Sequence, residues 1–551
     1  MNIEGIVAVI GFALAAYQIL PRWRQLDLSF RFGWLDAVAV TCCIAALLYL
    51  QFFPVFAALG LTPKLGLARW NATPDMAASL AIGLTTAFLF VHMRKRSALR
   101  PYRVTRFARL VDELIQAKEY AALFTILDRY VVRLWEIAQG QNRFARIRRW
   151  AMKGRHGFDH ETGMPDWTFV VIEMGEELMK PEPERKPIKE VSRFRDFVAP
   201  KLGRLIPKQR LKQDAAQAIL QRIFGTDEVL RELVVIRPEM MIRVLQRHEK
   251  HYEFLEPLLR QLLRTEGSAL YRQVAATQVV MKGHDYRIEP EGGLLDTLIG
   301  DATFAERHGL WQAISQEALA MFTELRRDPN SDPYNVSYDQ RFHDEDRWDY
   351  AFCIVVHYFD IMVSRALSQG VMHHMWLSYF ASFVERVCEN YSPVGPDYDP
   401  TQEFPTRYSF LLYQLFSVPM EWVRAVRELP KDQPNIQLTD IDAEYDDEHI
   451  PKAAIRVLAR SLRIVLTSGT LEERFKHYLA DIVFRLYFDL RQHGPRNYAD
   501  LLLFFITHDG YGQRNATYAR ALAAALEEAD MYFVMQYREL EQAIAAYNGK
   551  A

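Results

Sequence analysis

Residues 37–61 read AVAVTCCIAALLYLQFFPVFAALGL, a stretch in which Gln51 is the one strongly polar side chain. A helix rises about 1.5 Å per residue, so about 20 residues cross the roughly 30 Å hydrocarbon core of a bilayer. These 25 residues are long enough to do so. The stretch therefore predicts a transmembrane helix.

Two further apolar runs flank this one, at residues 3–20 and 76–93. The leader MNIEG carries no Lys or Arg, which disfavours a cleaved signal peptide. The sequence thus predicts three N-terminal transmembrane helices, at about 3–20, 37–61 and 76–93. The alternative is that all three are buried helices of a large soluble protein. Tryptophans, which favour the headgroup zone, stand just outside the runs at Trp23, Trp34 and Trp70.

Basic residues predict the orientation of these helices. The first loop holds Arg22, Arg24 and Arg31, whereas the second holds only Lys64 and Arg69. Because Lys and Arg are retained on the cytoplasmic side, we expect a multi-pass protein of the inner (plasma) membrane, with its N-terminus outside and its body in the cytosol. The segment after the third run agrees, with Arg94, Lys95, Arg96, Arg100, Arg103, Arg106 and Arg109.

The rest of the 551-residue chain has the composition of a folded protein, because half of all residues are hydrophobic and a quarter are charged. Its four cysteines lack the spacing of a zinc site or a disulfide framework, which indicates a reducing compartment. The sequence contains no Walker A, GxSxG, HExxH or protein-kinase signature. Composition and motifs therefore exclude the common nucleotide-binding and hydrolase classes that these signatures mark.

The body is predicted to be all-α. An apolar stripe from Phe107 to Ile115 and a second one within 119–138 predict a helical hairpin, and 167–172 is the one plausible strand. Later short helices resemble HEAT- or TPR-like packing, without a fixed repeat. We expect an anchor at 1–96, a basic juxtamembrane helical region at 97–180, and helical domains at 190–327 and 340–551. In the last, helices are expected near 344–368, 373–391, 406–429, 451–467, 471–492, 497–507 and 515–547.

A polar seam is expected on the helix predicted at 344–368. At 100° per residue its polar side chains fall within about 60° of one line. A His–Asp pair three residues apart can share a proton or bind a metal, and His343, His373 and His374 are candidates to join it. The alternative, which we favour, is a helix with one face in water. The seam comprises Asp346, Asp349, Tyr350, Cys353, His357, Asp360 and Ser364, of which Asp346, Asp349, His357 and Asp360 are candidate catalytic residues and His357 and Asp360 candidate metal ligands.

Charge is divided unevenly along the chain. Residues 94–155 hold 16 Lys/Arg against 5 Asp/Glu, and residues 328–448 hold 22 acidic against 8 basic residues. The basic segment begins at an anionic leaflet, where each Lys or Arg contributes about 1 kcal/mol. Lipid contact is therefore predicted for the proximal half, whereas the distal half at 143–155 is equally suited to RNA, to DNA or to the acidic segment of a neighbouring copy. For the protein as a whole, nucleic acid is not the favoured partner. The candidate contact residues are Arg94, Lys95, Arg96, Arg100, Arg103, Arg143, Arg146, Arg148 and Arg149.

These features predict a membrane-anchored sensor, scaffold or effector that acts by binding and oligomerisation, with a cytosolic protein partner, a homo-oligomeric state and no cofactor. By architecture alone, the plan is similar to that of bacterial antiviral defence effectors that perturb the inner membrane. The alternative is a membrane-tethered, metal-dependent hydrolase or nuclease that uses the seam around His357.

Overall fold

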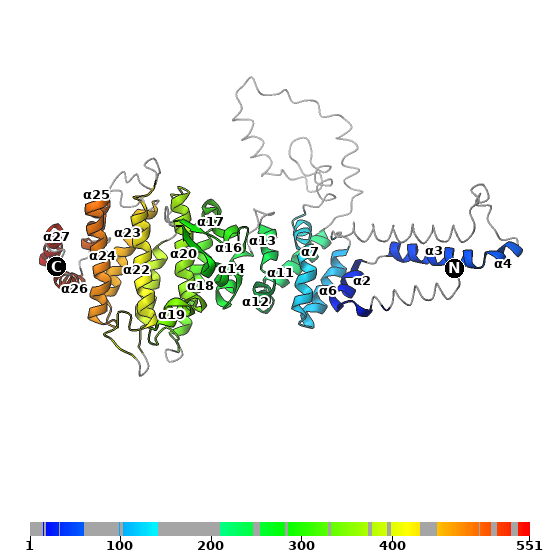
Figure 1. Cartoon of the computed structure of the whole chain (residues 1–551), viewed down its shortest axis with the longest axis horizontal. Helices are drawn as coiled ribbons and strands as arrows, with labels where there is room; N and C mark the ends of the chain where they lie inside the picture. The colour runs from blue at the N-terminus through cyan, green and yellow to red at the C-terminus, as the bar shows by residue number, and fades with distance from the viewer. Residues whose placement is uncertain are drawn as a thin grey trace, which may run out of the picture. The chain divides into compact units, whose positions relative to one another are not determined.

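The computed structural model is mostly helical, as the sequence predicts (Figure 1). Among the described residues, its one sheet is an antiparallel pair of short strands, β1 (Gln278–Val280) and β2 (Asp285–Arg287). The strand predicted at 167–172 lies outside the described residues. The structure describes residues 15, 18–31, 34–59, 99, 103–140, 210–245, 254–280, 285–328, 332–372, 377–393, 398–429, 449–494, 496–508, 515–529 and 538–550.

The chain divides into two compact units, Met1–Val229 (unit 1) and Leu230–Ala551 (unit 2), with the boundary inside helix α12 (Asp227–Ile236). In unit 1, α6 and α7 form the predicted helical hairpin, and both α2 and α11 pack against it. The helices of this unit are α2 (Arg22–Arg31), α3 (Trp34–Gln51), α4 (Phe53–Ala58), α6 (Val104–Gln116), α7 (Tyr120–Ala138) and α11 (Arg210–Phe224).

Unit 2 is a succession of packed helices (Figure 1). Its first part comprises α13 (Glu239–Leu245), α14 (Leu255–Arg264), α15 (Ala269–Ala276), α16 (Leu294–Ile299), α17 (Ala302–His308) and α18 (Leu310–Leu325). Its second part comprises α19 (Gln340–Asp344), the 3₁₀ helix η5 (Asp346–Asp349), α20 (Ala351–Ser368), α21 (Ser378–Asn390), α22 (Arg407–Ala425), α23 (Ile450–Thr467), α24 (Glu473–His493), α25 (Arg496–Thr507), α26 (Ala516–Glu528) and α27 (Arg538–Lys550).

Local capping explains several helix boundaries in unit 2. Asp301 accepts a bond from the Thr303 amide at the start of α17, and Gly309, with φ of +56°, ends that helix. Thr406 and Ser409 form a reciprocal capping box at the start of α22. The helices predicted at 406–429, 451–467, 471–492 and 497–507 agree with the structure to within a few residues, and the capping box explains the start of the first of them.

Two predictions about helices are corrected. The helix expected from 344 begins at Ala351, because α19 and η5 precede it and Tyr350 has extended backbone, with φ of −100° and ψ of 119°. The helix predicted at 515–547 is two helices, α26 and α27.

Three membrane spans are not supported by the described part of the chain. Residues 76–93 and most of 3–20 lie outside it, and the run at 37–61 is divided between α3 and α4. Pro54, which has no amide hydrogen to donate, lies beside this division. Within the described residues, α20 alone is long and apolar enough to cross a membrane, and it is largely buried among other helices of unit 2. Its burial is typical of a core helix.

Candidate functional site

The predicted polar seam is divided between two cavities of unit 2. Asp346 and Asp349 belong to η5 and line the larger one, whereas Asp360 and Ser364 belong to α20 and line the smaller one. Because α20 begins only after Tyr350, Asp346 and Asp349 do not lie on the same helix as Asp360, contrary to the prediction. The seam is therefore not a single site.

The larger cavity, which we call the α14–α18 cavity, has a volume of about 860 Å³. Its lining includes Arg264, Glu324, Arg341, Asp346, Asp349 and Tyr350. Much of its charge is already compensated, since Arg341 Nε lies 3.2 Å from Asp346 Oδ1 and Arg264 Nη2 lies 2.8 Å from Glu324 Oε1. This cavity combines both signs of charge and shows no clear preference for an anion or a cation.

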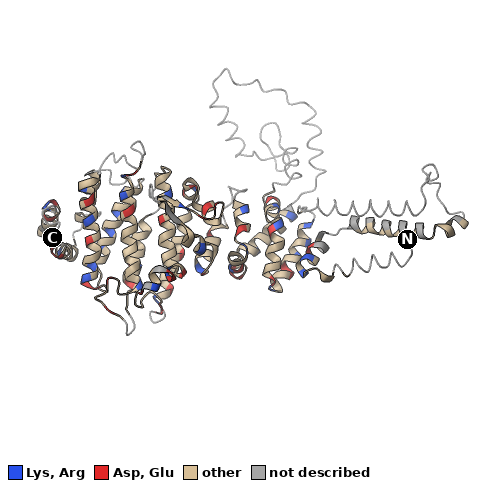
Figure 2. Cartoon of the chain, viewed as in Figure 1, with Lys and Arg blue, Asp and Glu red and all other residues tan. Residues whose placement is uncertain are grey.

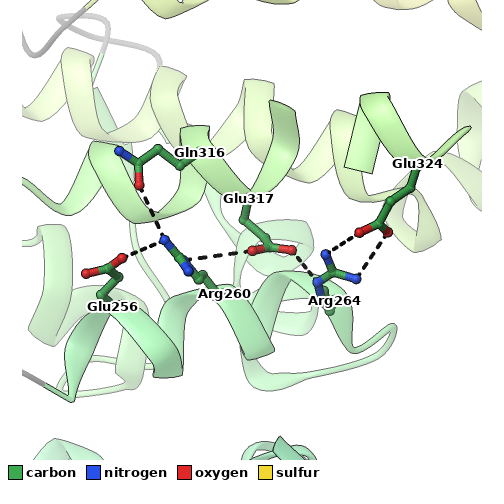
Figure 3. A network of polar contacts seen from close by, with 6 residues as sticks. All are labelled: Glu256, Arg260, Arg264, Gln316, Glu317 and Glu324. Atoms are coloured by element: carbon green, nitrogen blue, oxygen red, sulfur yellow. Dashed lines mark hydrogen bonds and ion pairs between the residues drawn. The ribbon is translucent and has the colours of Figure 1, made fainter. Parts of the chain in front are cut away.

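A network of arginines and carboxylates forms the wall between α14 and α18 (Figure 3). Arg260 and Arg264 extend from α14 toward the buried Glu317 of α18, and Arg264 also donates to Glu324. The hydrogen bond from Arg264 lowers the pKa of Glu324. Since Glu317 is only 6% exposed, its two arginine neighbours supply the counter-charge that a buried carboxylate requires.

The smaller cavity, which we call the α20–α22 cavity, has a volume of about 270 Å³. It is lined by residues from β2, α20 and α22: Tyr286, Asp360, Ser364, Ser417, Val418, Glu421, Trp422 and Ala425. Both β2 and α22 pack against α20. Elements far apart in the sequence thus build one polar pocket.

Asp360 is the central polar group of the α20–α22 cavity. Its Oδ2 accepts a hydrogen bond of 2.5 Å from the Tyr286 hydroxyl, and its Oδ1 accepts one of 2.9 Å from Trp422 Nε1 and a longer one of 3.4 Å from Ser364 Oγ. Burial raises the pKa of Asp360 to about 6, although these three donors act in the opposite direction. The carboxyl therefore changes charge near neutral pH.

His357 lies beside Asp360, with its Nδ1 3.9 Å from Asp360 Oδ2. Its ring packs against Tyr286 and Trp348, and burial lowers its pKa to about 4. The imidazole is therefore neutral at pH 7. Cys353, one turn earlier on α20, is buried in a way that raises its pKa to about 12, so it is a poor nucleophile.

No metal centre is assembled in the described ranges, where no three His, Cys, Asp or Glu side chains lie together as ligands. His343 packs its ring against Tyr338 and Phe410, while His373 and His374 lie outside the described residues. The candidate metal pair His357 and Asp360 therefore gains no third ligand from the residues the structure describes.

Unit 1 contains a second polar feature, at the contact of α2 with α7. Asp27 is 4% exposed and accepts hydrogen bonds from Arg129 Nη1 at 2.6 Å and from the Tyr130 hydroxyl at 2.9 Å. Beside it, Phe30 packs against Phe107 and Tyr130. The loop between the first two apolar runs is thus a helix docked on the hairpin, and no sequence motif marks this contact.

The predicted lipid contacts are only partly placed. Arg103 donates to the backbone oxygen of Phe30 at 3.2 Å, so it helps to hold α2. Arg106 and Arg109 are exposed on α6, and further basic residues lie on α2 (Figure 2). The other candidates lie outside the described residues: Arg94, Lys95, Arg96, Arg100, Arg143, Arg146, Arg148 and Arg149.

Sequence reasoning missed Tyr286 and Trp422, the two strongest donors to Asp360, because they are 74 and 62 residues away from it. The β hairpin that carries Tyr286 was not predicted either. No family model matches the chain, and neither the curated proteins nor the solved structures provide a match.

Proposed function

We propose that this chain is a membrane-anchored sensor or scaffold. In this proposal three N-terminal helices cross the membrane, the N-terminus is outside, and the helical body binds a partner or ligand in the cytosol. The docking of α2 on α6 and α7 carries the proposal, because within the described residues it joins the anchor segment to the helical hairpin.

The surface of α3 and α4 supports lipid as their surroundings. Large apolar side chains on these helices and next to them are between 40% and 65% exposed. A soluble monomer rarely exposes a large apolar surface to water, so these exposures support lipid or another apolar partner as the surroundings of α3 and α4. The side chains are Val38, Ile44, Leu48, Phe52, Val55 and Leu59.

The orientation is supported by a parity argument. Helix α2 precedes the apolar runs at 37–61 and 76–93, and α6 follows them. Since α2 packs on α6 and α7, the chain must return to the same side of the membrane between Arg31 and Val104. Two crossings satisfy this condition, and one crossing does not. The basic residues on α2 and α6 make the cytosolic side the common side.

The docked helix also provides a physical link for a signal. Two hydrogen bonds, from Arg129 and Tyr130 to the buried carboxylate of Asp27, join α2 to the hairpin. A displacement of the hairpin on ligand binding would therefore move α2 and the membrane helices next to it. Homo-oligomerisation belongs to the same proposal, because small residues in the runs at 3–20 and 37–61 permit close helix contacts in lipid.

Labelling of single cysteines tests the proposal. In a background without the four native cysteines, Arg24→Cys on α2 and Arg109→Cys on α6 are treated with a membrane-impermeant maleimide in sealed vesicles. Both must react from the cytosolic side, while Asn2→Cys must react from the opposite side. If Arg24→Cys and Arg109→Cys react from opposite sides, the parity argument fails and the topology is wrong.

A further inference from the structure

We propose that the α20–α22 cavity binds a small organic cation with a primary ammonium group, and that Asp360 is its counter-ion. The proposal goes beyond the anchoring function. It stands on residues of unit 2 only, so it does not depend on the membrane topology.

The carboxylate of Asp360 is buried among neutral side chains. The side chain of Asp360 is 15% exposed, and its three hydrogen-bond donors are neutral. His357, whose Nδ1 lies 3.9 Å from Asp360 Oδ2, is uncharged at pH 7. Among the described residues no Lys or Arg forms an ion pair with Asp360. A buried carboxylate is ordinarily paired with a cation, and Asp360 lines a cavity in which a cationic ligand could take that place.

The wall of the cavity is acidic and partly aromatic. Glu421 adds a second carboxylate, with Arg424 Nη1 2.8 Å away as its partner, and Arg424 is shared with Asp489. The cavity lining itself therefore contains two acidic groups and no basic one. Tyr286 and Trp422 add aromatic rings, which attract ammonium groups. Carboxylates beside aromatic rings form an environment that favours amines over anions.

The volume of the cavity limits the size of its ligand. The volume of about 270 Å³ lies just below the range of roughly 300–1,000 Å³ that is typical of drug-sized ligands. It corresponds to about nine water molecules at ~30 Å³ each. A short aliphatic or single-ring amine fits this space, whereas a peptide segment does not.

A metal ion is a poorer occupant than an ammonium group. Both oxygens of Asp360 already accept hydrogen bonds, and Ca²⁺ would require about six to eight oxygen ligands. The residues described here place no three metal-ligating side chains together. An ammonium group needs only the remaining acceptor capacity of Asp360 and an aromatic wall.

Titration calorimetry on the purified full-length protein tests the inference. The probes are 2-phenylethylamine and 1,4-diaminobutane, and the matched neutral compounds are 2-phenylethanol and 1,4-butanediol. We expect saturable binding of one amine per chain and no saturable binding of either alcohol. Lowering the pH from 7 to 5 should weaken amine binding about tenfold, because the ionised fraction of Asp360 falls by about that factor around a pKa of about 6.

Three variants localise the binding. Asp360→Asn removes the counter-ion and should lower the affinity for the amine at least tenfold. Ser417→Leu should lower it by a similar factor, because leucine fills the cavity without changing any charge. Glu527→Gln, an exposed position on α26, should leave the affinity unchanged. If Asp360→Asn does not fold, Ser417→Leu decides. Failure of both amines to bind, equal binding of an alcohol, or full affinity in Ser417→Leu overturns the inference and leaves the anchoring proposal intact.

Discussion

Removal of the Asp27 carboxylate should release α2 from the hairpin. Asp27 accepts hydrogen bonds from Arg129 and Tyr130, and its side chain is 6% exposed while that of Arg129 is 43% exposed. In Asp27→Ala the Tyr130 hydroxyl loses its buried acceptor, whereas Arg129 can turn toward water. The lost hydrogen bond of the buried Tyr130 hydroxyl therefore accounts for most of the destabilisation.

The magnitude follows from these exposures. Removing one partner of a fully buried ion pair costs about 3–5 kcal/mol, and a hydrogen bond to a charged group contributes about 1.5–3 kcal/mol. Because Arg129 remains partly hydrated, we expect a loss of about 2–3 kcal/mol. A loss of 2 kcal/mol raises the population of the opened state roughly 30-fold, since about 1.4 kcal/mol corresponds to a factor of ten.

Hydrogen exchange of the α2 backbone amides measures this opening directly. Asp112→Ala is the matched control, because the ion pair of Asp112 with Arg222 lies in the same unit but both side chains are at least 36% exposed. Such an exposed pair contributes only about 0–1 kcal/mol. If Asp27→Ala accelerates exchange in α2 no more than Asp112→Ala does, the buried pair does not hold the helix.

Three further predictions concern unit 2. Burial raises the pKa of Asp360 from its ordinary value of 3.8 to about 6, so the folded state binds a proton on this carboxyl more tightly than the unfolded state does. The stability that proton binding contributes is therefore lost as the pH rises from 4 to 6. The stability of the wild type relative to Asp360→Asn, measured by denaturant unfolding without added amine, should fall by about 2 kcal/mol over that range, and a constant difference would contradict the assignment. Glu317→Ala should destabilise the protein by about 3 kcal/mol, because it leaves Arg260 and Arg264 without their shared buried partner. Glu256→Ala, at an exposed ion pair with Arg260, should cost less than about 0.5 kcal/mol. Equal midpoints of thermal unfolding for the two variants would refute this prediction. Asn335→Ala should lower the free energy of unfolding by about 2–4 kcal/mol, because the buried Asn335 side chain donates to the Asn390 backbone oxygen and accepts from the Ser392 amide. An unchanged unfolding midpoint would show that these two hydrogen bonds do not stabilise the fold.

Local patterns in the sequence predict much of the helical fold. The apolar stripe around Phe107 predicts α6 because a helix repeats every 3.6 residues, and Thr406 marks the start of α22 because its hydroxyl can cap the amide three residues later. Both signals depend on neighbours within one or two turns. The helix that begins at Ala351 was predicted seven residues too early, because the apolar periodicity of α20 extends over the preceding turns without encoding the extended conformation of Tyr350.

The candidate site is predicted less completely. Periodicity places His357, Asp360 and Ser364 on one face of α20, but it cannot supply the partners that decide their chemistry. Tyr286 reaches Asp360 from a strand of three residues, which is too short to produce an alternating pattern. The docking of α2 could not be predicted from local patterns either, because Asp27 and Arg129 are 102 residues apart and meet only through tertiary packing.

The most direct test of the central claim, that lipid surrounds the N-terminal helices, is the partition of the full-length protein after membranes are washed with alkaline carbonate and sedimented. If lipid surrounds these helices, the protein remains in the membrane pellet and is released only by detergent. Recovery of the intact chain in the carbonate supernatant would contradict the anchor, the orientation and the sensor proposal together.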